Sequence, residues 1–270
     1  MNKKALRWIK VIVLLYCAIG IALYYLQHFF LFHPTVLGRD YQFRFDMPFA
    51  EVNIPVNKTD TLNMVQFFPA DSVKRRGVVI YFHGNRGNIN RYQRFVPGFT
   101  KHGYEVWMED YPGFGKSVGE RTERILYQQA EQVYKMANAK YSQDSIIIYG
   151  KSFGTGIASY LASVIECKQL ILETPYYSIP DLFGCYAFIY PTTRMSEYKI
   201  PTNEYLKEVK APVSIFHGTG DFVIPYRCAA KLKSVLKPSD QFVTIDKGSH
   251  RDLNKYPLFQ QKLDSLLQLP

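Results

Sequence analysis

"IIIYGKSFGTGIASYLA", residues 146–162, places a serine between two glycines at the end of an apolar run. Three isoleucines and a tyrosine are typical of a buried strand, and the apolar positions after Gly154 recur with helical spacing. Ser152 therefore stands in a predicted strand-to-helix turn. The G-x-S-x-G pattern, with Gly150 and Gly154, suits a sharp turn that lifts a nucleophilic hydroxyl out of a sheet. A plain turn could have the same residues, so the assignment depends on partners elsewhere in the chain.

Two other glycine-rich patterns overlap this region, and both fail. A Walker A phosphate loop needs a glycine five positions before its Gly-Lys pair. That position holds Ser145 before the GKS at 150–152, and Asp110 before the second GKS at 115–117. A dinucleotide-binding pattern fails because Ser159 replaces its third glycine. These residues predict no nucleotide cofactor.

A nucleophilic serine needs a base to accept its proton, and the base needs a carboxylate to orient it. In α/β enzymes with this turn, the chain order is serine, acid, histidine, each after a late strand. "PVSIFHGTGD" ends at Asp221 and "VTIDKGSH" ends at His250, and both follow predicted strands. Because parallel strands end at one edge of a sheet, we predict that Asp221 and His250 join Ser152 in a catalytic triad. Asp246 and Asp252 are the next candidates for the acid.

An acyl-transfer site also needs donors for the oxyanion that forms on the substrate carbonyl. One donor should be the backbone amide of Phe153, which follows the serine. The other should come from "HGNRGN", residues 83–88, a loop after another predicted strand. The amide of Asn85 is our candidate there. We expect His83 to brace this loop and His217 to pack at a strand end.

Short apolar runs separated by turns begin at about residue 35. A hairpin around "NKTD" comes first, and the later strands alternate with segments of helical spacing. This order predicts an α/β fold with a mostly parallel central sheet and helices on both faces, in one domain over 35–270. Residues 176–208, rich in aromatic residues and proline, interrupt the alternation. We expect a short cap that, with Phe153, walls an acyl pocket; an ordinary connection is the alternative.

The N-terminal segment predicts a membrane anchor. Residues 11–32 are almost wholly apolar, and about 20 such residues span a bilayer core. Residues 1–10 carry four Lys and Arg and no acid, which predicts a cytoplasmic tail and a catalytic domain on the other side of the membrane. In a bacterium that side is the periplasm or the exterior. A cleaved signal peptide is the rival, but "YYLQHFFLFHP" offers no small-residue cleavage site.

Net charge and cysteine content exclude several classes of protein. The formal charge is +10, but outside the tail the basic residues are scattered, so no nucleic-acid-binding stripe is evident. Cys17 lies in the apolar segment, and Cys167, Cys185 and Cys228 follow without a CxxC pair or zinc-ligand spacing. We predict no metal site. We expect the last three to be buried or free thiols, of which an exported domain would leave at least one unpaired.

Several motifs together resemble a known superfamily. "FHGNRGN", "EDYPGFGKS", "YGKSFG", "FHGTGDFVIP" and "GSHRDL" are similar to sequences of the α/β-hydrolase fold superfamily. They look most like its Bem46-like branch, the membrane-anchored α/β-hydrolase-domain proteins, over about residues 30–270. The resemblance implies that the nucleophile, acid and base fall on Ser152, Asp221 and His250, and the oxyanion-loop amide on Asn85.

The chain departs from that branch at two positions. Phe153 stands where the branch often has a smaller or aliphatic residue, and Arg251 stands where it often has asparagine after the histidine. Neither departure removes a catalytic group, but both affect how a substrate fits. The family that the chain resembles includes thioesterases that act on lipidated proteins, lipid hydrolases and proteins of unknown substrate.

We therefore expect a single-pass membrane protein whose serine hydrolase domain cleaves carboxylic ester or thioester bonds through an acyl-enzyme, without metal or cofactor. The expected substrates are acyl-bearing small molecules, lipids or lipidated proteins, and nucleic acid is not expected as a partner. Two rivals stay open. One is a serine peptidase of the same fold, and the other is a non-catalytic binding or scaffold protein that keeps the fold.

Overall fold

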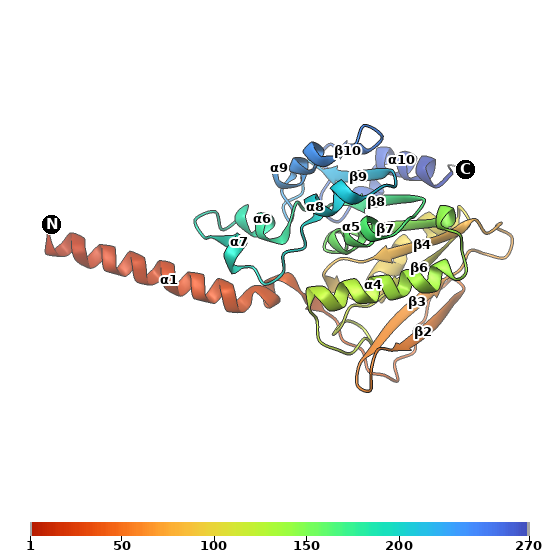
Figure 1. Ribbon diagram of the computed structural model, residues 1–270, viewed down its shortest axis with the longest axis horizontal. Coiled ribbons are helices and arrows are strands. Elements are labelled where there is room, and N and C mark those ends of the chain that lie inside the picture. The colour runs from red at the N-terminus through yellow and green to blue at the C-terminus, as the bar shows by residue number, and fades with distance from the viewer. Residues whose placement is uncertain (1, 269–270) are drawn as a thin grey trace.

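A twisted sheet of eight strands forms the centre of the computed structural model, which describes residues 2–268 (Figure 1). In space the strands follow the order β10, β9, β8, β7, β4, β6, β3, β2. Their bounds are β2 Phe49–Pro55, β3 Thr61–Phe67, β4 Gly77–Phe82, β6 Tyr104–Glu109, β7 Ile146–Lys151, β8 Gln169–Glu173, β9 Val213–Gly218 and β10 Gln241–Ile245. The β2–β3 and β3–β6 pairs are antiparallel and the other pairs of this sheet are parallel, which confirms the predicted architecture.

Helices cover both faces of the sheet, and each face has its own apolar core. The helices on one face are α4 Glu123–Asn138, α5 Gly154–Val164, α8 Thr202–Glu208 and α9 Tyr226–Ala229. The helices on the other face are α2 Ile89–Tyr92, α3 Pro97–Thr100 and α10 Pro257–Gln268. Every residue of β4, β6, β7 and β9 is buried. This two-sided burial explains why their sequences are continuous apolar runs rather than alternating ones.

One of the segments with helical spacing, "NRYQRFVPGFTKHG" at residues 90–103, does not form a single helix. The chain there forms α2, a 3₁₀ turn at Gln93–Phe95 and then α3. Pro97 has no backbone N–H to donate, so it starts a new helix instead of continuing the earlier one.

The segment between β8 and β9 contains α6 Ile179–Gly184, α7 Thr192–Met195 and α8. Only part of it stands apart from the sheet. Helix α8 packs against α5 and buries Leu206 in the core, whereas α6 and α7 lie beside the N-terminal helix (Figure 1). The aromatic residues of this segment therefore divide between the core and the region above the strand ends.

The N-terminal helix α1 spans Lys3–Leu31 and extends away from the domain (Figure 1). Its most apolar 18-residue window has a mean hydropathy of 2.2 and no buried residue, so by length and composition it can cross a membrane. From Tyr16 onward, the helix contacts the α6–α7 segment and the residues just after it. The Tyr16 ring stacks on Tyr190 at 4.6 Å, and the Gln27 side chain accepts a hydrogen bond from the Glu197 amide at 2.7 Å. The helix thus joins the domain by specific contacts and not by a free linker.

Candidate active site

Ser152 lies between β7 and α5 with a backbone φ of 53°, in the left-handed region. A non-glycine residue rarely adopts this conformation, and such strain is common at functional sites. The flanking glycines allow it by close approach. A Cβ atom at Gly154 would lie 2.2 Å from the carbonyl oxygen of Phe82, and one at Gly150 would lie 2.6 Å from the Cα atom of Thr155. The turn therefore requires the two glycines of the motif.

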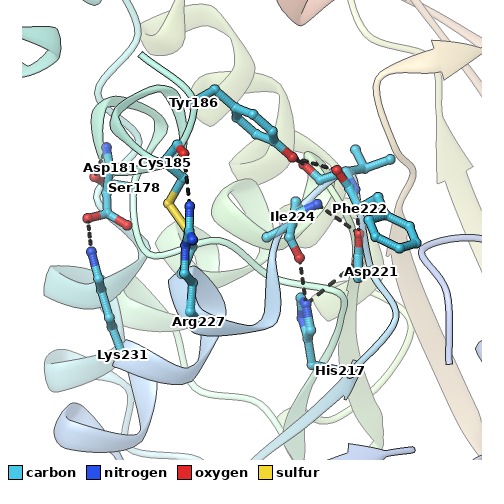
Figure 2. Close-up of a disulfide and its surroundings, with 12 residues drawn as sticks. Ser178, Asp181, Cys185, Tyr186, His217, Asp221, Phe222, Ile224, Arg227 and Lys231 are labelled. Atoms are coloured by element: carbon cyan, nitrogen blue, oxygen red, sulfur yellow. Dashed lines mark hydrogen bonds and ion pairs between the residues drawn. A yellow bond between two sulfur atoms is a disulfide. The ribbon is translucent and has the colours of Figure 1, made fainter. Parts of the chain in front are cut away.

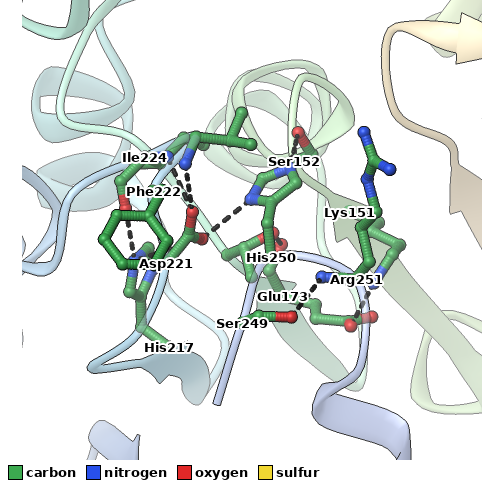
Figure 3. Close-up of polar contacts among 12 residues, drawn as sticks. Lys151, Ser152, Glu173, His217, Asp221, Phe222, Ile224, Ser249, His250 and Arg251 are labelled. Carbon is green, nitrogen blue, oxygen red and sulfur yellow. Dashed lines mark hydrogen bonds and ion pairs between the residues drawn. The ribbon is translucent and has the colours of Figure 1, made fainter. Parts of the chain in front are cut away.

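The structure brings His250 and Asp221 to this serine, although they are far apart in the chain (Figure 3). His250 Nε2 lies 2.8 Å from the Ser152 hydroxyl oxygen, and His250 Nδ1 lies 2.8 Å from Asp221 Oδ2. The imidazole of His250 thus contacts the serine through one ring nitrogen and the aspartate through the other. This chain of contacts has the geometry that a nucleophile, base and orienting acid require.

The loop that begins at Asp221 holds this carboxylate in place. Its Oδ1 accepts hydrogen bonds from the amides of Val223 and Ile224, each at 2.8 Å. Burial acts to raise the pKa of Asp221, but the hydrogen bond and charge of His250 and the hydrogen bond from the Ile224 amide outweigh it. The pKa of Asp221 is therefore below its usual value. The acid remains a carboxylate at neutral pH.

His217 and His83 are both buried beneath the site. His217 Nε2 donates to the carbonyl of Ile224 at 2.9 Å, and burial lowers the pKa of this imidazole. A neutral His217 then supports the Asp221 loop. His83 lies 3.1 Å from Asp110, and its Nδ1 lies 2.7 Å from the carbonyl of Gly84. Their positions fit the bracing and packing roles expected from the sequence.

The loop with Asn85 passes beside the serine. A Cβ atom at Gly84 would lie 3.4 Å from the Ser152 Cβ, and Asn85 lines the same cavity as Ser152. Within residues 2–268, the backbone amides of Asn85 and Phe153 donate no hydrogen bond to another protein group. Two unused amides beside a nucleophile are the arrangement that an oxyanion hole needs.

The end of α1 attaches directly to this loop. The Asn85 side chain donates to the carbonyl of Leu31 at 2.6 Å, and the amide of His33 donates to the carbonyl of Asn85 at 2.9 Å. The short strands β1 His33–Pro34 and β5 Arg86–Gly87 then pair in parallel. The N-terminal helix is therefore coupled to the loop that contains a candidate oxyanion donor.

One polar network beside the serine was missed by the sequence reasoning. Lys151 pairs with Glu173 (Figure 3). The Tyr149 hydroxyl donates to the same carboxylate at 2.6 Å. The Ser152 amide donates to the Glu173 carbonyl at 2.8 Å. The network ties β7 to β8 at the turn. Its only sequence signal was a charged residue at the end of each of two buried strands.

Two neighbouring cavities lie at the site. The smaller, about 140 Å³, contains Ser152 and His250. The larger, about 340 Å³, is mainly apolar and lies between α1 and the α6–α7 segment, with Leu23, Leu182 and Phe183 in its walls. The cavities share three lining residues, Phe30, Asn85 and Val223.

The expected role of Phe153 in the pocket wall is wrong. Its side chain lines neither of these cavities, because it points into the core, where its ring lies 5.1 Å from that of Phe32 and 5.7 Å from that of Tyr111. Residue Phe183 and two tyrosines of the α6–α7 segment do line the larger cavity, as does helix α1. Helix α1 thus forms a wall that the sequence did not predict.

The cysteine expectation is also corrected. Cys185 and Cys228 form a disulfide that joins the end of α6 to α9 (Figure 2), while Cys167 is free. Near the disulfide, the Tyr186 hydroxyl donates to the carbonyls of Phe222 and Val223 at 2.5 and 3.1 Å. The α6 segment is therefore fastened to the loop that follows Asp221. In the described part of the chain, no group of three or more His, Cys, Asp or Glu side chains could hold a metal ion.

Known proteins match the chain in sequence and in fold. Residues 73–202 match the family described as serine aminopeptidase, S33. The α/β hydrolase domain-containing protein 17C of Xenopus tropicalis is 27% identical over 200 residues, which cover 71% of this chain and 62% of that protein. The lysophosphatidylserine lipase ABHD12 of Mus musculus is 30% identical over 188 residues, covering 61% of this chain and 46% of that protein. The matches thus span less than two thirds of these relatives.

Solved structures share the fold at low sequence identity. An esterase of Pyrococcus furiosus superimposes with a TM-score of 0.67 at 18% identity, covering 88% of this chain and 97% of the esterase. The Butyrivibrio proteoclasticus protein Est1E, with ferulic acid bound, has a TM-score of 0.61 at 18% identity and covers 80% of this chain and 96% of its own. These likenesses establish the fold.

Proposed function

The chain belongs to the α/β-hydrolase fold superfamily, and from that membership we propose that it is a membrane-anchored serine hydrolase of acyl esters or thioesters. The observation that supports this most is the line of contacts from Ser152 through His250 to Asp221, with 2.8 Å at each step. A scaffold protein that only keeps the fold has no need of this arrangement.

The proposed reaction starts at the serine hydroxyl. Ser152 Oγ attacks the acyl carbonyl while His250 Nε2 takes its proton, and Asp221 holds Nδ1–H so that Nε2 is free to accept. His250 then gives the proton to the leaving alcohol or thiol, which departs and leaves an acyl-serine. Water, activated by the same histidine, hydrolyses the acyl-enzyme and releases the fatty acid. No step needs a metal or cofactor.

The negative charge of the tetrahedral intermediate would lie between the amides of Asn85 and Phe153. Both amides are unused within residues 2–268, so they need not break a protein hydrogen bond to bind the oxyanion. Each such donor lowers the barrier by about 3 kcal/mol. Because Asn85 also bonds to Leu31, we propose that the end of α1 keeps this donor in position.

The larger cavity suits an acyl chain. Its apolar walls come from the α6–α7 segment and from α1, with Leu23 on the helix and Leu182 opposite. Most residues of α1 are apolar and exposed, and its last turns line the cavity. An acyl chain could therefore pass from the bilayer along the helix toward the serine. The lipid or acyl substrate class rests on this cavity and on the lipase among the relatives.

Ester turnover should rise with acyl length. With the full chain in phosphatidylcholine nanodiscs, we expect kcat/KM for p-nitrophenyl esters to increase by up to about fourfold per methylene, from about 0.8 kcal/mol of burial each. Esters of about six to ten carbons should therefore be better substrates than the acetate, until the larger cavity, which Leu182 helps to line, is filled. A strong preference for acetate would contradict the acyl cavity.

A matched pair of variants tests the helix wall. Leu23→Trp places a large ring in the cavity and should remove the advantage of long chains. Leu14→Trp, at an exposed position on the same helix, should keep it. Equal chain-length profiles in the two variants would show that α1 does not line the acyl site.

The peptidase alternative has one observation in its favour, the family described as serine aminopeptidase that matches residues 73–202. The apolar cavity favours a fatty acyl group over a peptide. A decanoyl ester and aminoacyl p-nitroanilides, assayed with the same preparation, separate the two. Faster cleavage of the aminoacyl amides would favour the peptidase.

We also propose that the domain faces away from the cytoplasm, with the basic tail inside. The Cys185–Cys228 disulfide supports this orientation, because such bonds persist mainly in oxidising compartments. In a bacterial host, alkaline phosphatase fused after residue 268 should be active, since that enzyme folds only outside the cytoplasm. Activity of a cytoplasmic reporter at the same position, with an inactive phosphatase fusion, would reverse the orientation.

A further inference from the structure

Four arginines surround the mouth of the small cavity that contains Ser152: Arg86, Arg91, Arg94 and Arg251. They come from separate elements: β5, α2, the 3₁₀ turn at Gln93–Phe95 and the residue after the histidine of the site. All four are exposed. The fold therefore gathers four permanent positive charges around one small opening.

No carboxylate neutralises these charges. Within residues 2–268, none of the four arginines forms an ion pair, and no Asp or Glu lines the cavity. The one other cation in the lining, Lys151, is already paired with Glu173. Four like charges along one cavity, with no acid among its lining residues, make this cavity attractive to an anion.

We propose that these arginines form an anion-binding subsite, and that the substrate is an acyl ester with an acidic group, a phosphate or a carboxylate, on its leaving-group side. This rests on the proposed hydrolase function. Ser152 lines only the smaller of the two cavities, so an ester whose acyl chain lies in the apolar cavity has its leaving group beside Ser152 and the arginines. Guanidinium groups bind phosphate and carboxylate through paired N–H donors.

The subsite also has a consequence for the reaction. The leaving alcohol takes its proton from His250, and Arg251 follows that histidine directly. An acidic group bound between Arg251 and the other three arginines of the cavity would hold the leaving oxygen close to His250. The Bem46-like proteins that this chain resembles often have asparagine after the histidine. An asparagine has no charge, so it could not form an ion pair with an acidic group in this way.

A pair of soluble esters tests the substrate class. The octanoyl esters of para-hydroxybenzoate and of para-hydroxybenzamide differ in the charge of the leaving group. With the full chain in phosphatidylcholine nanodiscs, we expect kcat/KM to favour the benzoate ester by at least about tenfold, and high salt should reduce this ratio. Octanoyl glycerol phosphate compared with octanoyl glycerol then shows whether phosphate is preferred to carboxylate. Equal turnover of charged and neutral esters would overturn the proposal.

Variants assign the preference to the arginines. Arg91→Gln combined with Arg94→Gln should bring the ratio of charged to neutral ester turnover close to one. Arg44→Gln, an exposed arginine outside the cavity, should leave the ratio unchanged. Arg86→Gln with Arg251→Gln is a second pair, should the first variant fail to fold. A ratio that survives both pairs would overturn the proposal.

A binding measurement separates this subsite from the hydrolase function. Hexyl phosphate should bind the Ser152→Ala chain in calorimetry, and adding Arg91→Gln and Arg94→Gln should weaken binding by at least about tenfold. This result needs no turnover, so it stands or fails independently of catalysis. If the arginine variants lose only their binding to phosphatidylserine vesicles and keep the ester ratio, the cluster docks on membranes and the substrate proposal is wrong.

Discussion

Replacing Ser152 with alanine is expected to reduce ester hydrolysis to the background rate, a loss of roughly 10⁶ in kcat. The hydroxyl lies 2.8 Å from His250 Nε2, and alanine leaves the histidine with nothing to activate. The variant should also lose all labelling by a fluorophosphonate probe, because the probe reacts only with an activated serine. Alanine keeps the Cβ atom, so the turn and the fold should persist.

Ser163→Ala is the matched control for this experiment. Ser163 lies on α5, the helix that follows the nucleophile, and its hydroxyl donates to the carbonyl of Tyr160. Activity and labelling should be unchanged in this variant. Equal hydrolysis or labelling by wild-type protein and Ser152→Ala would rule out Ser152 as the nucleophile. A folded wild-type chain that neither hydrolyses esters nor reacts with the probe would favour the scaffold alternative.

Asp221→Asn is expected to lower kcat by about 10⁴. Oδ1 of Asp221 accepts two backbone N–H groups, so the asparagine must place its carbonyl oxygen there. Its amide nitrogen then faces His250 Nδ1, where Oδ2 now accepts. An N–H donor at this position stabilises the tautomer with the proton on Nε2, which cannot take the proton of Ser152. The loss should be in kcat, with little change in KM.

The other two candidate acids provide controls. Asp246 accepts a hydrogen bond from the Thr219 hydroxyl, and Asp252 accepts one from the Ser249 amide. Within residues 2–268, the carboxylate that bonds to His250 is that of Asp221 and neither of these two. Asp246→Asn and Asp252→Asn should therefore keep most of their activity. If Asp221→Asn keeps near-wild-type turnover and one of the two controls loses most of its activity, the residue changed in that control is the catalytic acid and Asp221 is not.

The fold class could be predicted from the sequence because its signals are local. Continuous apolar runs such as "GVVIYF" predict strands buried on both faces, and the alternation with helical segments predicts a parallel sheet. Parallel strands end at one edge of the sheet, so the sequence alone predicts that Ser152, Asp221 and His250 lie near one another. The apolar run of α1 predicts a segment that can cross a membrane in the same way, from length and composition alone.

Other features depend on contacts between distant segments, which no local pattern encodes. The direction of the Phe153 side chain follows from the space that Phe32 and Tyr111 leave in the core. The pairing of Cys185 with Cys228 follows from how α6 packs near α9, because spacing alone is compatible with several pairings.

The surroundings of the serine were likewise decided only by tertiary structure. In the sequence, Arg91, Arg94 and Arg251 are three of many scattered basic residues, and Leu23 is one of many apolar residues in the anchor. Folding places the arginines around one opening and the helix along one cavity. The physical reason is that strand and helix formation depend on neighbours in the chain, whereas a binding surface depends on the relative positions of elements that pack together only in the complete fold.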